Sequence, residues 1–368
     1  MKKEMREACF VCTTPYQVIG AISIVNAYKI DADIYILGMF DAYREVAKML
    51  RKYKIFLGIY DIDSAKFRAQ DKTVKAFSIA SMQMLFAERT LAYFLPSQIC
   101  YNKMYTSSRA HVKVLFQHVM QKRNPSMNIV LYDDGVGSYL KDSHIFKVSH
   151  LRKRLEKLLR WKLFMPEKTS LLLYCPELAE RPCEFEKCEW AVMPRIKWDR
   201  DSREMLCRVF GVDQQKTITE KCILFDELRG VEKVADKKSE LLDQCFLVLD
   251  EYMHGNIICK SHPRSLKETQ TGITLYPNSS APAEVLYAVM PDLEEKILVS
   301  YCSTALFTPK IMFGKEPAVI MLHRIIDGSS NTTGERLYQK LHSIYNKKSR
   351  VIAPNNLEQL RNYLNGKR

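Results

Sequence analysis

The stretch NIVLYDDGVG, residues 128–137, decides the fold, because an apolar run leads directly into two carboxylates and a glycine turn. A short continuous apolar run that ends at turn residues is typical of a strand buried on both faces of a parallel sheet. Ligands of such sheets bind at the carboxyl ends of the strands, which is where Asp133 and Asp134 fall. This segment therefore predicts a parallel sheet and indicates which end of it to search for chemistry.

The same alternation of short β-rich runs with helical periodicity extends in both directions from this segment. It is the pattern of an α/β fold in which helices pack on both faces of a parallel sheet. A first series of strands is predicted at 8–14, 33–37, 55–60, 128–132 and 170–174, and a second at 222–225, 256–259, 273–276, 297–301, 318–321 and 350–352.

The two series are separated by a polar, charged stretch, residues 194–221, that has no strong strand pattern. We expect the domain boundary there, with one Rossmann-like lobe over residues 1–205 and a second over residues 206–368. A chain of 368 residues with 47% apolar content can bury a large core, and its length suits two domains better than one.

The formal net charge of +14 predicts a surface that attracts polyanions, nucleotides or anionic lipid head groups. One basic amphipathic segment, residues 151–165, suits either an anionic membrane surface or a helix that covers its own core. A nucleic-acid-binding protein is disfavoured, because the chain lacks a basic tail and a recognisable module with interleaved basic and aromatic residues.

Eleven cysteines, an odd number without regular spacing, indicate reduced thiols in a cytoplasmic protein. Cys9 and Cys12 fall on a predicted strand that would point them to opposite faces, so we expect no metal site there. No apolar run is long enough to span a bilayer. The sequence therefore predicts a cytoplasmic protein, with peripheral contact to the inner face of an anionic membrane as an open alternative.

Two strands of the second series also end in polar clusters. The first leads into Lys260, His262, Pro263 and Arg264. Proline restricts the preceding residue to extended backbone, which fixes the direction of the histidine ring. An imidazole beside two cations suits a phosphate, and a surface histidine in a proline turn is the alternative.

The second cluster, Ser303 and Thr304, follows the strand predicted at 297–301 and stands at an expected helix start. Hydroxyls and unpaired backbone N–H groups at a helix N-terminus bind anions, although the same residues cap many helices. Together, the strand ends would set a carboxylate pair opposite two phosphate-type sites, as a base faces a nucleotide leaving group. The glycine signatures of dehydrogenases and P-loop NTPases are missing from the sequence.

Three short motifs occur in the order found in bacterial sialyltransferases, which this chain resembles. They are Asp133-Asp134-Gly135, His262-Pro263 and Ser303-Thr304. The segment CTTPYQVIGA, residues 12–21, also resembles the opening strand and loop of the lipooligosaccharide sialyltransferases of glycosyltransferase family 52. The resemblance implies a GT-B fold of two Rossmann-like lobes with a cleft between them, a CMP-sialic acid donor, inversion at the anomeric carbon, and no metal ion or other cofactor.

The resemblance also implies roles for single residues. Asp133 would deprotonate the acceptor hydroxyl as the general base. Asp226, which ends the first strand of the second lobe, is a competing base, because family 52 members carry an acidic residue near the donor there. We prefer Asp133 because its strand end belongs to the acceptor-side lobe.

For the donor, His262 would bind the CMP phosphate and protonate it as it leaves. The phosphate, ribose and cytidine would be held by side chains of the second lobe. These are Lys260, Pro263, Arg264, Glu284, Ser303 and Thr304. The partners implied are a nucleotide sugar and a glycan, such as a galactoside of a surface lipooligosaccharide or capsule, and a homodimer is known in the resembling family.

One rival enzyme class stays open, a transferase of the same architecture that uses CMP-Kdo or a UDP-hexose. UDP-sugar enzymes more often recruit a divalent ion through a DxD motif. The one nominal DxD considered, Asp61-Ile-Asp63, precedes an ordinary polar loop and is interpreted as solvated turn residues.

Overall fold

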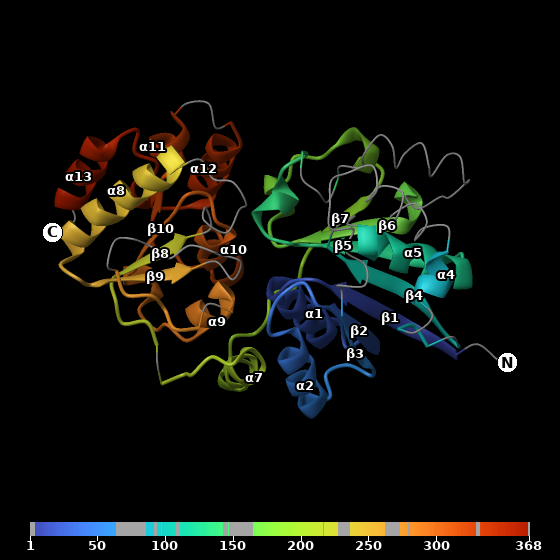
Figure 1. Cartoon of the computed structure of the whole chain (residues 1–368). Helices are drawn as coiled ribbons and strands as arrows, with labels where there is room; N and C mark the ends of the chain where they lie inside the picture. The colour runs from blue at the N-terminus through green and yellow to red at the C-terminus, as the bar shows by residue number, and fades with distance from the viewer. Residues whose placement is uncertain are drawn as a thin grey trace. The chain divides into compact units, whose positions relative to one another are not determined.

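The computed structural model describes residues 4–63, 86–91, 94–96, 98–107, 111–142, 146, 165–215, 217–226, 236–261, 273–278, 280–328 and 332–366. The chain forms two compact units, Met1–Lys197 and Trp198–Arg368. Each unit is built on its own parallel sheet with helices around it (Figure 1). The predicted α/β class with two Rossmann-like units is confirmed. The observed division falls after Lys197, inside the polar stretch 194–221, whereas the sequence pattern places it after residue 205.

The first unit contains seven strands in the order β3-β2-β1-β4-β5-β6-β7, and every neighbouring pair is parallel. They are β1 (Glu4–Cys12), β2 (Ala32–Leu37), β3 (Ile59–Ile62), β4 (Ile99–Thr106), β5 (Asn128–Tyr132), β6 (Thr169–Leu173) and β7 (Glu189–Val192). From β1 the chain adds β2 and β3 on one side of the sheet, and it then adds β4 to β7 on the other side. The strand order therefore reverses between β1 and β4. A ligand of this kind of sheet binds at the carboxyl ends near that reversal.

The first helix of the first unit starts where the sequence supplies both a cap and a proline. Thr14 accepts the backbone N–H of Gln17, and Pro15 occupies the first turn of the first helix, where its missing N–H is harmless. The α-helices described are α1 (Pro15–Tyr28), α2 (Tyr43–Tyr53), α4 (Ala87–Leu91) and α5 (His111–Arg123), and the 3₁₀ turns are η2 (Val136–Tyr139), η3 (Pro166–Lys168), η4 (Pro176–Leu178) and η5 (Cys183–Phe185).

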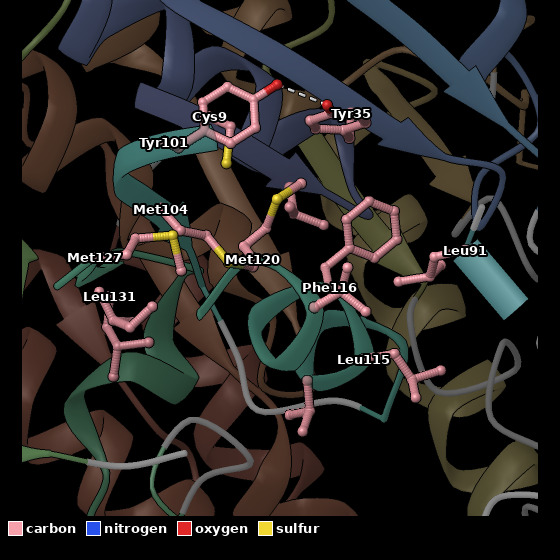
Figure 2. Close-up of a cluster of buried hydrophobic side chains, with 14 of the residues drawn as sticks. Cys9, Tyr35, Leu91, Tyr101, Met104, Leu115, Phe116, Met120, Met127 and Leu131 are labelled. Carbon is pink, nitrogen blue, oxygen red and sulfur yellow. Dashed lines mark hydrogen bonds between the residues drawn. The ribbon is translucent and has the colours of Figure 1, made fainter. Parts of the chain in front are cut away.

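The core of the first unit fixes α5 against one face of the sheet. Figure 2 shows Phe116 and Met120 of α5, Met104 of β4 and Leu131 of β5 in one buried cluster. Burial of each side chain of this size stabilises the fold by roughly 1.5–3 kcal/mol. Because these contacts anchor α5, they also fix the first turn of that helix near the carboxyl ends of the strands.

The second unit contains five parallel strands in the order β12-β11-β10-β8-β9. They are β8 (Cys222–Asp226), β9 (Ile257–Ser261), β10 (Ile297–Ser300), β11 (Ala318–Met321) and β12 (Val351–Ile352). Here the order reverses between β8 and β10, so a ligand is expected at the carboxyl ends of β8, β9 and β10.

Helices α8, α11 and α13 lie together in the second unit (Figure 1). The α-helices described are α7 (Arg200–Phe210), α8 (Asp236–Met253), α9 (Ala283–Ala288), α10 (Thr308–Phe313), α11 (His323–Asp327), α12 (Thr332–Ile344) and α13 (Leu357–Asn365), and the 3₁₀ turns are η7 (Leu293–Glu295), η8 (Thr304–Leu306) and η10 (Lys348–Arg350).

Two strands were not predicted, and the strands predicted at 8–14, 55–60 and 273–276 differ clearly from the structure, since β1 already begins at Glu4. The pattern misses β4, because Asn102 and Lys103 interrupt its apolar run, and it misses β7, which is short and half exposed. The strand predicted at 55–60 begins later, at Ile59. Residues 273–276 contribute one isolated bridge, Cys259 with Leu275, instead of a strand.

All eleven cysteines are free thiols in the structure. Cys9 lies in the core cluster beneath α5, whereas Cys12 contacts the hydroxyl of Tyr132 at 3.3 Å on the other face of the sheet. No helix in the described parts of the chain is both long and apolar enough to cross a bilayer. The basic segment 151–165 lies outside the described residues apart from Met165.

Candidate active site

Asp133 follows β5 and is completely buried, with 0% of its side chain exposed. Both carboxylate oxygens accept hydrogen bonds. One accepts the N–H of Gly135 at 2.8 Å and the hydroxyl of Tyr16 at 3.2 Å. The other accepts the hydroxyl of Tyr139 and the N–H of Tyr174, the latter at 3.2 Å. A carboxylate has about four acceptor positions, so Asp133 is saturated in this state.

Burial raises the pKa of Asp133 to about 6, although the hydrogen bonds from Tyr139 and Gly135 oppose this by favouring the charged form. A carboxylate with a pKa near neutrality is a stronger base than an ordinary one and is still ionised at pH 7. The Tyr16 contact is long, and Tyr16 is half-buried. A substrate hydroxyl that replaces the Tyr16 hydroxyl would leave the other three bonds of Asp133 in place.

Asp134 is half-buried and is held by a different set of groups. The Nε2 atom of Gln17 donates to its Oδ1 at 2.7 Å, and its backbone N–H donates to Ser138 Oγ at 2.8 Å. Tyr16 and Gln17 are consecutive residues in the first turn of α1. That turn therefore contacts both carboxylates.

A buried ammonium group completes this cluster. Lys113 lies on α5 with 1% exposure, and its Nζ contacts Gln17 Oε1 at 2.9 Å and Ser107 Oγ at 2.8 Å. Burial lowers the pKa of Lys113, and the charge of Asp134 opposes that shift. Sequence reasoning missed Gln17 and Lys113, although Lys113 is an isolated charge in the apolar run HVKVLF, which was the available signal.

In the second unit, Asp226 ends β8 and is 2% exposed. The register pairs Asp226 with Ser261 of β9, and Phe225 with both Lys260 of β9 and Ser300 of β10. The Oγ of Ser300 donates to the carbonyl oxygen of Phe225 at 2.8 Å. The carboxyl ends of the three strands thus lie together, as the strand order requires.

Lys260 and Glu284 form a buried pair of opposite charge near these strand ends. Burial lowers the pKa of Lys260 to about 8, and the charge of Glu284 opposes the shift. Burial also raises the pKa of Glu284, which accepts the hydroxyl of Thr308 at 3.3 Å. The same hydroxyl lies 3.3 Å from the carbonyl oxygen of Thr304, so Glu284 is connected to the start of η8.

Ser303 caps η8, since its Oγ accepts the N–H of Ala305 at 3.3 Å. The expected helix start is therefore present, as a 3₁₀ turn that leads into α10. The second unit brings Asp226, Lys260, Glu284, Ser303 and Thr304 to the carboxyl end of its sheet, while Asp133 belongs to the first unit. His262, Pro263 and Arg264 directly follow β9 and lie outside the described residues.

Two other features bear on ligands. Within the described ranges, no group of three or more His, Cys, Asp or Glu side chains is arranged to hold a metal ion. Asp61 and Asp63 of the nominal DxD motif instead form ion pairs with Arg51 and Arg44, both of α2. A pocket of about 490 Å³ in the first unit is lined by residues such as Lys103, and it includes none of the candidate site residues.

A family model described as alpha-2,8-polysialyltransferase (POLYST) matches residues 9–323. The match covers most of the chain and includes every candidate site residue named above. The chain belongs to the alpha-2,8-polysialyltransferase family. It is therefore a glycosyltransferase of the sialyltransferase kind, which confirms the coarser part of the predicted resemblance. The assignment to family 52 stays a prediction.

Solved structures of other glycosyltransferases are similar to this polysialyltransferase-family chain over nearly its whole length. LpCGTa in complex with UDP is 9% identical over 98% of this chain and 90% of its own, with a TM-score of 0.49. The calicheamicin glycosyltransferase CalG4 is 10% identical over 100% and 90%, with a TM-score of 0.46. The trehalose-phosphate synthase of Burkholderia vietnamiensis is 10% identical over 98% and 97%, with a TM-score of 0.41. No curated protein matches the sequence.

Proposed function

We propose that the chain transfers sialic acid from CMP-sialic acid to a glycan hydroxyl, with inversion at the anomeric carbon and without a metal ion. One observation carries the proposal. In a chain of the polysialyltransferase family, an acidic pair and a Ser-Thr pair lie at the carboxyl ends of the strands of two parallel sheets. Those are the positions where this kind of sheet binds its ligands.

In the proposed reaction Asp133 is the base. The acceptor oxygen bonds to the anomeric carbon while the bond from that carbon to the CMP phosphate breaks, and its electron pair leaves with CMP. The acceptor proton moves to Asp133. The raised pKa of Asp133, about 6, and the replaceable Tyr16 contact at 3.2 Å support this role.

The donor would be held by the second unit. Lys260, Ser303 and Thr304 would bind the phosphate, together with the segment His262–Arg264, while Glu284 would accept the ribose hydroxyls. The buried connection from Glu284 through Thr308 to Thr304 supports a shared ribose and phosphate site. Because the leaving CMP carries one phosphate, a cation, a histidine and N–H groups suffice to stabilise it, which is the chemical reason to propose metal independence.

The rival base is Asp226, which is buried at the end of β8. Since Asp226 lies among the proposed donor residues, it is well placed to contact the donor. Asp133 is preferred because its first-unit site combines a raised pKa with a hydroxyl contact that a substrate can replace.

The acceptor would be a terminal sialic acid of a growing chain, as the description of the family suggests. A net charge of +14 suits retention of such a polyanion. The product would belong to a surface lipooligosaccharide or capsule, made at the cytoplasmic side with peripheral membrane contact and by a homodimer. These finer points, with family 52 membership, are part of the proposal.

The test is transfer by the purified chain with CMP-sialic acid and a short oligosialic acid in the presence of EDTA. We expect CMP release, with products longer by sialic acid units in mass spectrometry. Turnover of CMP-Kdo or a UDP-hexose but not of CMP-sialic acid would overturn the donor assignment. Activity that is lost in EDTA and restored by Mg²⁺ would overturn metal independence.

A further inference from the structure

The orientation of one buried amide links the first turn of α1 to Asp134. The Oε1 atom of Gln17 accepts the N–H of Thr13 at 2.6 Å, the hydroxyl of Thr13 at 3.1 Å and the ammonium of Lys113 at 2.9 Å. A backbone N–H and an ammonium can only donate, so these contacts determine which end of the amide is the oxygen. Nε2 must therefore lie at the other end, where it donates to Asp134 at 2.7 Å.

Orienting the Gln17 amide with Lys113 requires the burial of an ammonium group, which is unfavourable in free energy. Lys113 is 1% exposed, and the hydrogen bonds of its ammonium go to two neutral oxygens, those of Gln17 and Ser107. Burying an ammonium without a directly paired carboxylate is unfavourable in a protein interior. The compensating negative charge belongs to Asp134, on the far side of the Gln17 amide. The two charges and the amide thus form one chain of interactions.

The two carboxylates that meet the first turn of α1 differ in access. Asp133 contacts Tyr16 and is fully buried, whereas Asp134 contacts Gln17 and is half-buried. Because Tyr16 and Gln17 are consecutive, the bonded oxygens of both carboxylates lie against the same helical turn. A ligand that reaches Asp133 by replacing the Tyr16 hydroxyl therefore also comes close to Asp134.

We propose that Gln17 and Lys113 are positioning residues for the acceptor: Lys113 holds the Gln17 amide so that it presents the Asp134 carboxylate to a second hydroxyl of the acceptor sugar. The class of ligand is a pair of hydroxyls on adjacent carbons, one facing each aspartate. The inference rests on the proposed function, since it assigns the acceptor to the end of the sheet that holds Asp133.

The first test is Gln17→Glu, which keeps the size of the side chain but removes the N–H that Asp134 accepts. We expect the acceptor KM to rise roughly ten- to a hundredfold, as for loss of one hydrogen bond to a charged group. The KM for CMP-sialic acid should stay unchanged. The matched control is Gln117→Glu, which makes the same change at another buried glutamine, on α5, whose amide contacts Gln121.

The second test separates a positioning role from a structural one. If Gln17 acts through Asp134, the double variant of Gln17→Glu with Asp134→Asn should have the acceptor KM of Asp134→Asn alone. Effects that multiply would overturn the inference. Lys113→Met should raise the acceptor KM and Lys113→Arg should restore it in part, while Lys296→Met, at a buried lysine of the second unit, serves as the control. If Lys113→Met fails to fold, the comparison of Gln17→Glu, Asp134→Asn and their double variant still tests the inference.

Acceptor affinity can be measured without the transfer reaction and tests the same inference. Calorimetric titration of an oligosialic acid into the wild-type chain and into the Gln17→Glu and Gln117→Glu variants should show weaker binding for Gln17→Glu alone. Equal affinities in the three proteins would overturn the inference. Failure of the proposed function looks different, because the wild-type chain would then not turn over CMP-sialic acid.

Discussion

Asp133 and Asp134 are neighbours in sequence with the same side chain, yet their surroundings give them different chemistry. Asp133 has no exposed surface, four hydrogen bonds and a pKa raised to about 6 by burial. Asp134 is half-buried and fixed by the amide of Gln17. Under the proposed function, packing alone would make a proton acceptor and a hydroxyl-binding carboxylate from two adjacent aspartates.

Asp133→Asn should abolish most transfer while leaving CMP binding near normal. The asparagine keeps the size of the side chain but cannot take the acceptor proton, and a general base contributes roughly 10²- to 10⁴-fold to rate. Initial rates and CMP titration measure the two effects separately. Retained turnover in this variant, with loss in Asp226→Asn, would move the base to Asp226.

The pH dependence of transfer should follow the ionisation of Asp133. Because the base must be charged, kcat should fall as the pH decreases through about 6. Tyr139→Phe removes a hydrogen bond that lowers this pKa, so the acidic limb of the rate profile should move to higher pH. A profile whose acidic limb does not move in Tyr139→Phe would contradict the assignment.

The same shift predicts how stability depends on pH. The folded pKa of Asp133, about 6, lies above the ordinary value of 3.8, so the folded state binds the proton more tightly. Its contribution to stability is then fully present below pH 3.8 and is lost as the pH rises through about 6. Asp133→Asn should flatten this part of the curve, which denaturant unfolding at several pH values would measure.

At the scale of secondary structure, the strand ends were predictable and the contacts between them were not. Runs such as residues 128–132 and 297–300 are apolar because parallel strands are buried on both faces, so their ends mark the site in sequence. Strand β4 was missed because Asn102 and Lys103 interrupt its apolar run. Gln17 reaches Asp134 across 117 residues and Lys113 across 96, and no local pattern encodes such pairings.

The strand ends of the second unit predict how CMP binding depends on pH. Burial lowers the pKa of Lys260 to about 8. Its side chain is therefore positively charged at pH 7, and this charge is lost as the pH rises through about 8. If Lys260 binds the phosphate, CMP affinity should weaken over that range. Lys260→Met should bind CMP weakly and lose the pH dependence, and Lys310→Met of α10 is a control at a half-buried lysine outside the proposed donor site. An unchanged pH dependence in Lys260→Met would remove this residue from the donor site.

At the scale of the whole molecule, each unit has its own parallel sheet and core, and the proposed donor residues all belong to the second unit. A ligand that binds only the native state stabilises it, by about 2.7 kcal/mol at one hundred times its Kd. CMP should therefore slow hydrogen exchange most in peptides that contain the ends of β8, β9 and β10. The peptides around Asp133 should change little, since CMP lacks the acceptor. Mass spectrometry of the full chain with and without CMP measures both regions at once. Protection centred on residues 128–137 instead would reverse the proposed assignment of donor and acceptor to the two units.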